Sequence, residues 1–133
     1  IHIVVLLVYK SWTIYIYIIT TMADNEEELV APRHKGWLQK LGGAEGGRQN
    51  WKKRFFVLKN DLSYYDSDKQ YEKGKDPKGV VALDCHYTCP VEGSELEFAV
   101  HAYPRTLMCK AANVEEMQEW IGILKRTSDE DEN

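Results

Sequence analysis

The distribution of apolar residues along the chain predicts a series of short β-strands followed by one helix. From residue 34 onward, short apolar runs recur between turn signals, which is the pattern of an antiparallel β-protein. The segments between residues 42–50 and 66–79 are glycine-rich or polar, so both are expected to be loops. The expected strands cover residues 34–41, 51–58, 62–65, 80–83, 86–91, 96–102 and 105–111.

The last element has a different period. Asn113 is a favourable helix N-cap, and Glu116 follows three residues later, which is the spacing of a capping box. Five apolar side chains then recur on one helical face: Val114, Met117, Trp120, Ile121 and Leu124. Such a face is expected to pack against the sheet, so the predicted fold is mainly β: a seven-stranded antiparallel sandwich or barrel capped by one C-terminal α-helix.

The chain has 133 residues, enough for one domain with a hydrophobic core. We expect an N-terminal extension over residues 1–33, the domain over 34–126, and an acidic disordered tail over 127–133. Residues 1–21 are apolar, and Lys10 lies near their midpoint, where a charge would be costly in a bilayer. Our interpretation is that they are a translated upstream sequence preceding a start at Met22; a membrane anchor is the alternative.

The charges are unevenly distributed. The whole chain has a formal net charge of −4, but eight of its acidic residues lie before residue 33 or after residue 128. Between residues 33 and 59, by contrast, eight cations stand against Glu45 alone, a local charge of +7. Such an electrically polarised domain is steered toward anionic surfaces.

Two of these cations continue rows of apolar residues. Side chains two apart along a strand share a face, so Lys40 lies on the face of Leu38, and Arg54 on the face of Phe56 and Leu58. Each cation comes where its row reaches the loop between the two strands. Arginine offers a planar fork for two phosphate oxygens and lysine a movable point charge. The pattern therefore predicts a phosphate-binding pocket at the mouth of the first hairpin.

The three cysteines do not indicate disulfides or a metal centre. An odd number of cysteines favours a reducing compartment over a disulfide framework. Cys85 and Cys89 flank His86 in a way that weakly suggests metal ligands, but a second ligand pair at fixed spacing is missing. We therefore expect buried thiols and no metal site or cofactor.

Other classes of function are disfavoured. The sequence contains no G-x-S-x-G or H-E-x-x-H motif and no Cys/His/Asp grouping at a useful spacing, so an enzyme is not expected. Trp51, Phe55 and Tyr65 interleave with cations, as in some nucleic-acid-binding proteins. Aromatic residues in strands are more simply core residues, and the acidic ends of the chain would oppose a polyanion.

Several of these segments together resemble the pleckstrin homology (PH) domain family over about residues 34–126. The resemblance implies a curved β-sandwich that is open at its loop end and capped by the helix at the other end. The matching segments are Gly36-Trp37-Leu38-Gln39-Lys40, Trp51-Lys52-Lys53-Arg54-Phe55-Phe56-Val57-Leu58, Leu62-Ser63-Tyr64-Tyr65, Lys78-Gly79-Val80, Leu96-Glu97-Phe98 and Glu115-Glu116-Met117-Gln118-Glu119-Trp120-Ile121.

The resemblance also implies a set of binding residues. Phosphoinositide-binding members carry a lysine late in the first strand and a Lys/Arg-x-Arg pattern early in the second, which correspond to Lys40, Lys52 and Arg54. A third-strand tyrosine, here Tyr65, contributes in members that favour 3-phosphorylated inositides. Two further cations are expected to assist, Arg48 in the intervening loop and Lys78 before the fourth strand.

The function expected from these features is a phosphoinositide-binding module that recruits a signalling adaptor to membranes. We expect a cytoplasmic monomer that associates peripherally with the plasma membrane or other phosphoinositide-bearing membranes, without a cofactor or nucleic acid. Glu45 in the first loop would repel phosphates and favours weaker lipid binding. The alternative is therefore a protein–protein interaction scaffold with weak or no lipid binding.

Overall fold

The computed structural model describes residues 31–43 and 49–131. The chain divides into two units, residues 1–31 and 32–133, and the fold described here is that of the second. The expectations for the apolar segment 1–21 and for Arg48 lie outside the described residues. Within the described part, no helix combines the length and the apolar composition needed to cross a membrane.

Seven strands form one antiparallel sheet in the order β4-β3-β2-β1-β7-β6-β5. The fold is therefore mainly β, as the sequence predicts. The strands are β1 (His34–Gly42), β2 (Asn50–Leu58), β3 (Leu62–Tyr65), β4 (Gly79–Val81), β5 (His86–Pro90), β6 (Glu97–Ala102) and β7 (Arg105–Lys110). The helices in the described part are the short α3 (Asp68–Glu72) and the C-terminal α4 (Val114–Asp131).

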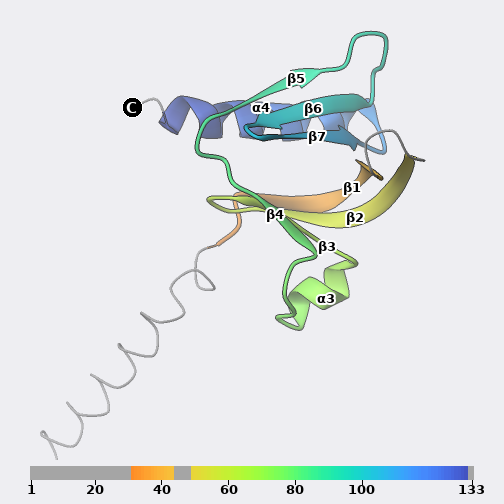
Figure 1. Ribbon diagram of the computed structural model, residues 1–133, viewed down its shortest axis with the longest axis vertical. Coiled ribbons are helices and arrows are strands. Elements are labelled where there is room, and N and C mark those ends of the chain that lie inside the picture. The colour runs from red at the N-terminus through yellow and green to blue at the C-terminus, as the bar shows by residue number, and fades with distance from the viewer. Residues whose placement is uncertain (1–30, 44–48, 132–133) are drawn as a thin grey trace, which may run out of the picture. The chain divides into compact units, whose positions relative to one another are not determined.

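The sheet bends at β1, which is shared by its two halves. β1 pairs with β2 over its full length of nine residues. With β7 it pairs only at Gln39 and Lys40. Because the strands separate beyond these two positions, β1–β3 and β5–β7 lie in two layers, with α4 running beside the second layer (Figure 1). This bend produces the sandwich and leaves part of β1 without a neighbour from the second half.

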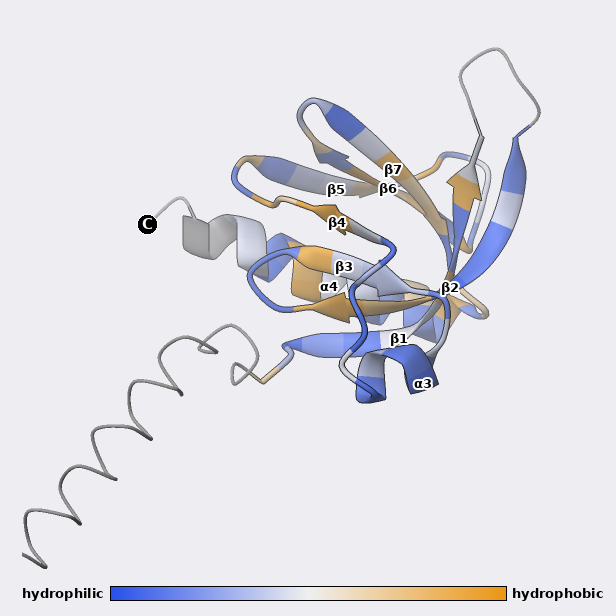
Figure 2. Ribbon diagram, turned by 60° about the horizontal axis from the view of Figure 1, so that its bottom comes forward, coloured by the Kyte–Doolittle hydropathy of each residue, from blue (hydrophilic) through white to orange (hydrophobic). Residues whose placement is uncertain are grey.

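The core fills the space between the two layers and α4. Figure 2 shows apolar residues distributed over the strands, and the buried ones form one hydrophobic core cluster. Phe56, Leu58 and Val100 are completely inaccessible to solvent, and Trp120 from α4 is 2% exposed. Burying a large apolar side chain contributes about 1.5–3 kcal/mol, so the aromatic and aliphatic residues of this cluster dominate the stability of the fold.

The predicted helix begins as expected but differs in two details. The backbone N–H of Glu116 donates a hydrogen bond to Oδ1 of Asn113 at 2.8 Å, which confirms the N-cap. Val114 is 37% exposed, so its expected burial is wrong; it lies in the first turn, before the helix reaches the sheet. The helix continues to Asp131, so residues 127–131 of the tail that was expected to be disordered are helical, and residues 132–133 lie outside the described residues. Thr127 is buried, and the hydroxyl of Ser128 donates to the carbonyl oxygen of His86 at 2.8 Å.

The segment between β3 and β4 contains a helix that the sequence analysis treated as loop. Ser67 is the N-cap of α3, and its hydroxyl oxygen accepts a hydrogen bond from the N–H of Gln70. Ser67 and Gln70 match the S-x-x-Q form of the capping box, so the sequence did contain a signal for the start of this helix. β4 is displaced from the expected residues 80–83 to Gly79–Val81.

The cysteines are not all buried, as had been expected. Cys109 is fully buried in the core, but Cys89 is half-buried and Cys85 is exposed. Cys85 lies in the connection between β4 and β5. Within residues 31–43 and 49–131, no three potential ligand side chains gather as a metal site would require.

Candidate anion-binding site

The register between β1 and β2 places three of the expected cations on one face. Lys40 lies directly opposite Lys52, and Leu38 directly opposite Arg54. Residues opposite one another, and residues two apart on a strand, share a face of the sheet. Leu38 is 2% exposed, so this face is the one that turns inward. Lys40, Lys52 and Arg54 therefore extend the inward face toward the loop that joins β1 and β2.

The side chains of Lys40 and Lys52 converge over Gly42. A β-carbon at Gly42 would lie 3.6 Å from Nζ of Lys40 and 3.7 Å from Cδ of Lys52. Nζ of Lys40 also lies 4.9 Å from the centroid of the Tyr64 ring, a cation–π distance. The ring of Tyr64 thus holds the ammonium group of Lys40 at the edge of the core.

Tyr64 connects this pair to the start of β4. It lies opposite Gly79 in the β3–β4 register and is buried. A β-carbon at Gly79 would overlap the phenol ring and hydroxyl of Tyr64, so only glycine leaves room for this ring position. The backbone N–H of Lys78 donates to the carbonyl oxygen of Tyr64 at 2.8 Å. The close approach of β3 and β4 brings Lys78 to the same rim.

Asp66 lies between the two remaining cations. Its Oδ1 is 3.6 Å from Nε of Arg54 and accepts a hydrogen bond from Nζ of Lys78 at 3.1 Å. The Arg54 side chain is only 18% exposed, whereas those of Lys78 and Asp66 are 50% and 59% exposed. An Nη of Arg54 also donates to the carbonyl oxygen of Lys53 at 2.8 Å, which fixes the guanidinium group. We call Lys40, Lys52, Arg54 and Lys78 the basic cluster.

Tyr65, which was expected at this site, lies on the opposite face of the sheet. It pairs with Phe55, and its ring centroid is 5.2 Å from that of Tyr71 in α3. Partial burial, followed by the proximity of Tyr71 and Asp76, raises the pKa of Tyr65. The structure therefore brings four of the six expected residues together, leaves Tyr65 apart, and does not describe Arg48.

Two residues of the site were missed by sequence reasoning. Tyr64, and not Tyr65, is the third-strand tyrosine that lies beside Lys40, and Asp66 lies between Arg54 and Lys78. Strand alternation puts Tyr64 and Tyr65 on opposite faces, but only the register, which pairs Tyr64 with Phe56, places Tyr64 in the inward row. Nothing in the sequence alone fixes the contact of Asp66 with both cations.

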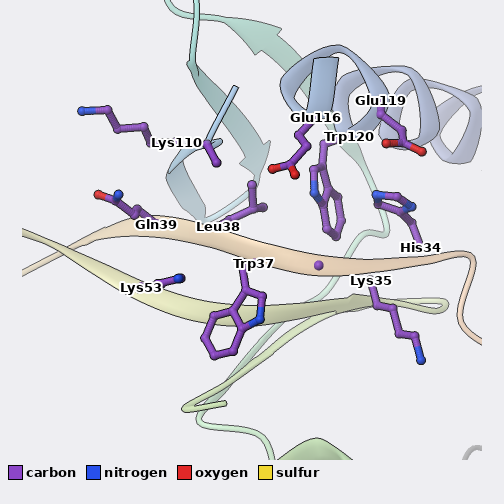
Figure 3. A pocket seen from close by; sticks show the side chains of 12 residues that line it. His34, Lys35, Trp37, Leu38, Gln39, Lys53, Lys110, Glu116, Glu119 and Trp120 are labelled. Atoms are coloured by element: carbon purple, nitrogen blue, oxygen red, sulfur yellow. The ribbon is translucent and has the colours of Figure 1, made fainter. Parts of the chain in front are cut away.

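A cavity of about 430 Å³ lies elsewhere, between β1 and α4, and none of the basic cluster lines it (Figure 3). The cluster is instead an open rim, and residues 44–48, between β1 and β2 in the sequence, lie outside the described residues. Its chemistry is nevertheless defined: four cations, one competing carboxylate and one aromatic ring offer a site for a ligand with several phosphate groups.

A bent seven-stranded sheet closed by one helix, with cations gathered at its rim, defines a small β-sandwich domain. The family model described as PH domain matches residues 32–129. The chain therefore belongs to the PH domain family, as its resemblance to that family predicts.

Longer proteins match parts of this chain in sequence. Switch-associated protein 70 from Mus musculus is 34% identical over 115 residues, which cover 80% of this chain and 18% of that protein. Cytohesin-3 from Homo sapiens is 40% identical over 53 residues, or 40% of this chain and 12% of the relative. The chain thus spans less than a fifth of the length of either protein.

Solved structures share the fold. The C-terminal PH domain of pleckstrin in complex with D-myo-Ins(1,2,3,5,6)P5 has a TM-score of 0.63 and 29% identity, covering 74% of this chain and 97% of that chain. The PH domain of human oxysterol binding protein-related protein 11 has a TM-score of 0.63 and 25% identity, covering 73% and 80%.

Proposed function

We propose that the domain binds a phosphoinositide headgroup at the basic cluster and thereby recruits the chain to membranes. The observation that carries this proposal is the convergence of Lys40, Lys52, Arg54 and Lys78 on one rim of the sheet. Inositol phosphates carry several phosphate groups on one small ring, so a cluster of cations from β1, β2 and the residue before β4 can contact more than one phosphate at once. A single phosphate monoester would use only part of it.

The cations would make different contacts with the phosphates, because arginine and lysine differ in shape and mobility. Arg54 is mostly buried and held by the Lys53 carbonyl oxygen, so its guanidinium can form a pre-oriented pair of hydrogen bonds with one phosphate. Lys40 and Lys52, which converge over Gly42, supply movable charges for a neighbouring phosphate. Hydrogen bonds to charged groups contribute about 1.5–3 kcal/mol each, so a few of them suffice for micromolar binding.

A headgroup must compete with Asp66 for the cations of this site. The Asp66 carboxylate pairs with Arg54 and Lys78 in the absence of ligand, so a headgroup must replace these contacts with its own. A phosphate with two charges can compete for both cations, whereas a phosphodiester with one charge competes poorly. We infer that the domain selects multiply phosphorylated inositides over ordinary anionic phospholipids.

The relatives support the ligand class. The C-terminal PH domain of pleckstrin, with the same fold and 29% identity, has been solved in complex with an inositol pentakisphosphate. By this proposal the chain is a cytoplasmic adaptor that associates peripherally with the plasma membrane or another phosphoinositide-bearing membrane. A protein-interaction role, the alternative expected from the sequence, would use other surfaces, because the basic cluster matches phosphates.

The test is vesicle binding by the full 133-residue chain. We expect co-sedimentation with phosphatidylcholine vesicles that contain a few per cent of a bis- or tris-phosphorylated phosphoinositide. Vesicles with phosphatidylserine at equal total charge should bind the chain weakly. Soluble inositol phosphates should compete with the vesicles, and binding should weaken as salt rises. Equal binding to both vesicle types, or to neither, would contradict the proposal.

A further inference from the structure

Part of β1 lacks a strand partner on one side. β7 pairs with β1 only at Gln39 and Lys40, and among the described residues no other strand pairs with the β7 side of residues 34–38. Alternate residues of this stretch therefore direct backbone N–H and C=O groups toward an open edge. Such an edge is a template for an additional strand.

The cavity of about 430 Å³ follows this same edge. Residues 34–39 of β1 line it, together with Glu116, Glu119 and Trp120 of α4 and with Lys53 and Lys110. Its volume lies within the range of about 300–1,000 Å³ that is usual for ligand pockets. In Figure 3, Glu116 and Trp120 reach toward β1 from the α4 side, whereas Trp37 and Lys35 extend from the opposite side of the strand. We call this feature the β1-edge groove.

The two walls of the groove carry opposite charges. On the α4 wall, Glu116 and Glu119 are both exposed. On the opposite wall, Lys35 and Lys53 are exposed, and Nζ of Lys53 lies 5.0 Å from the centroid of the Trp37 ring. An added strand would direct successive side chains alternately toward the two walls.

We propose that the β1-edge groove binds an extended peptide segment in which basic and acidic residues alternate, paired as an extra strand with residues 34–38. The basic side chains would face Glu116 and Glu119, and the acidic ones would face Lys35 and Lys53. Five paired residues span about 17 Å at 3.3–3.4 Å per residue. The main-chain hydrogen bonds would supply affinity, and the charge alternation would supply selectivity and orientation.

This surface is separate from the basic cluster. Lys53 is next to Arg54 in β2, but neighbouring residues of a strand point to opposite faces, and none of the basic cluster lines the groove. The peptide site therefore goes beyond the proposed lipid function, and each can be lost without the other.

The first test uses two synthetic octapeptides and the isotopically labelled 133-residue chain. One peptide alternates Arg and Glu; its control has four Arg followed by four Glu, with the same composition. We expect the alternating peptide to shift the amide resonances of residues 34–38 and of the first turns of α4, and to bind several-fold more tightly than the block peptide. Methylation of the backbone nitrogens that face β1 should abolish binding, and methylation of the other set should leave it unchanged.

The second test uses a matched pair of charge reversals. Glu115 and Glu116 are neighbours in the first turn of α4, but only Glu116 lines the groove. Glu116→Lys should weaken binding of the alternating peptide about fivefold, while Glu115→Lys and Arg54→Ala leave it unchanged. Binding of neither peptide, equal binding of both, amide shifts elsewhere, or concentration-dependent pairing of the chain with itself through β1 would overturn the proposal.

Discussion

The carboxylate of Asp66 lies 3.6 Å from Nε of Arg54, inside the rim where an anionic ligand would bind. The same oxygen accepts a hydrogen bond from Lys78. An acidic side chain therefore occupies part of the space that the cations would offer to phosphate. Asp66 directly follows β3, and its contacts with Arg54 and Lys78 place its carboxylate at this rim.

Replacing Asp66 by asparagine should strengthen phosphoinositide binding. The change removes a negative charge about 4 Å from the expected phosphate position, where two unit charges in water interact by about 1 kcal/mol, so affinity should rise about fivefold. Titration of Asp66→Asn with a soluble inositol phosphate measures this. Asp68→Asn removes the same charge at the first turn of α3 and is the control. Equal gains from both changes would show that only net charge matters.

Replacing Gly79 by alanine should destabilise the fold. The added β-carbon would overlap the ring of Tyr64, which supports Lys40 through its cation–π contact. Overpacking of this kind costs about 1–3 kcal/mol, measured as the free energy of unfolding in urea. Gly122→Ala is the matched control, because nothing lies within 4 Å of its β-carbon, and alanine is favoured in a helix. A Gly79→Ala variant as stable as wild type would contradict this packing.

The cysteines should differ sharply in reactivity. Burial raises the pKa of Cys109 to about 12, although nearby Lys40 lowers it in part. Because only the thiolate reacts, iodoacetamide at pH 8 should alkylate the exposed Cys85 and leave Cys109 intact until the chain unfolds. Mass spectrometry of the labelled peptides distinguishes the sites. Labelling of Cys109 in the native protein would contradict its burial.

The same thiol gives a pH dependence of stability. Its folded pKa lies above the ordinary value of 9.0, so the unfolded chain loses this proton first as pH rises. The contribution of Cys109 to stability is therefore complete below about pH 9 and is lost between about pH 9 and 12. Denaturant unfolding across this range should show a smaller decline for Cys109→Ala than for wild type. An equal decline in stability for Cys109→Ala and for wild type would contradict the raised pKa of Cys109.

Much of the fold could be predicted because local pattern and tertiary structure agree. The alternation of side-chain faces along the strands predicted that Leu38 and Phe56 point inward, and the N-cap residue Asn113 predicted where α4 begins. The extent of α4 could not be predicted, because its last turn is acidic and polar. That turn is held by tertiary contacts, such as that of Ser128 with the backbone of His86, which a local pattern does not reveal.

The site could be predicted in part for a similar reason. Lys40 and Arg54 follow from strand alternation, but the choice between Tyr64 and Tyr65 depends on the β2–β3 register. A shift of one residue exchanges the faces, and adjacent tyrosines give no means to decide between them. The short helix α3 was missed because the surrounding residues are polar and none of its own residues is buried.

The measurement that tests the central claim most directly compares Arg54→Ala with Lys53→Ala. These neighbours in β2 carry the same charge, but Arg54 belongs to the basic cluster, whereas Lys53 lies on the opposite face of the sheet. Both variants are titrated with phosphoinositide vesicles and with a soluble inositol phosphate. We predict that Arg54→Ala weakens binding about tenfold or more, whereas Lys53→Ala changes it less than twofold. Undiminished binding by Arg54→Ala, or an equal loss in both variants, would contradict the account.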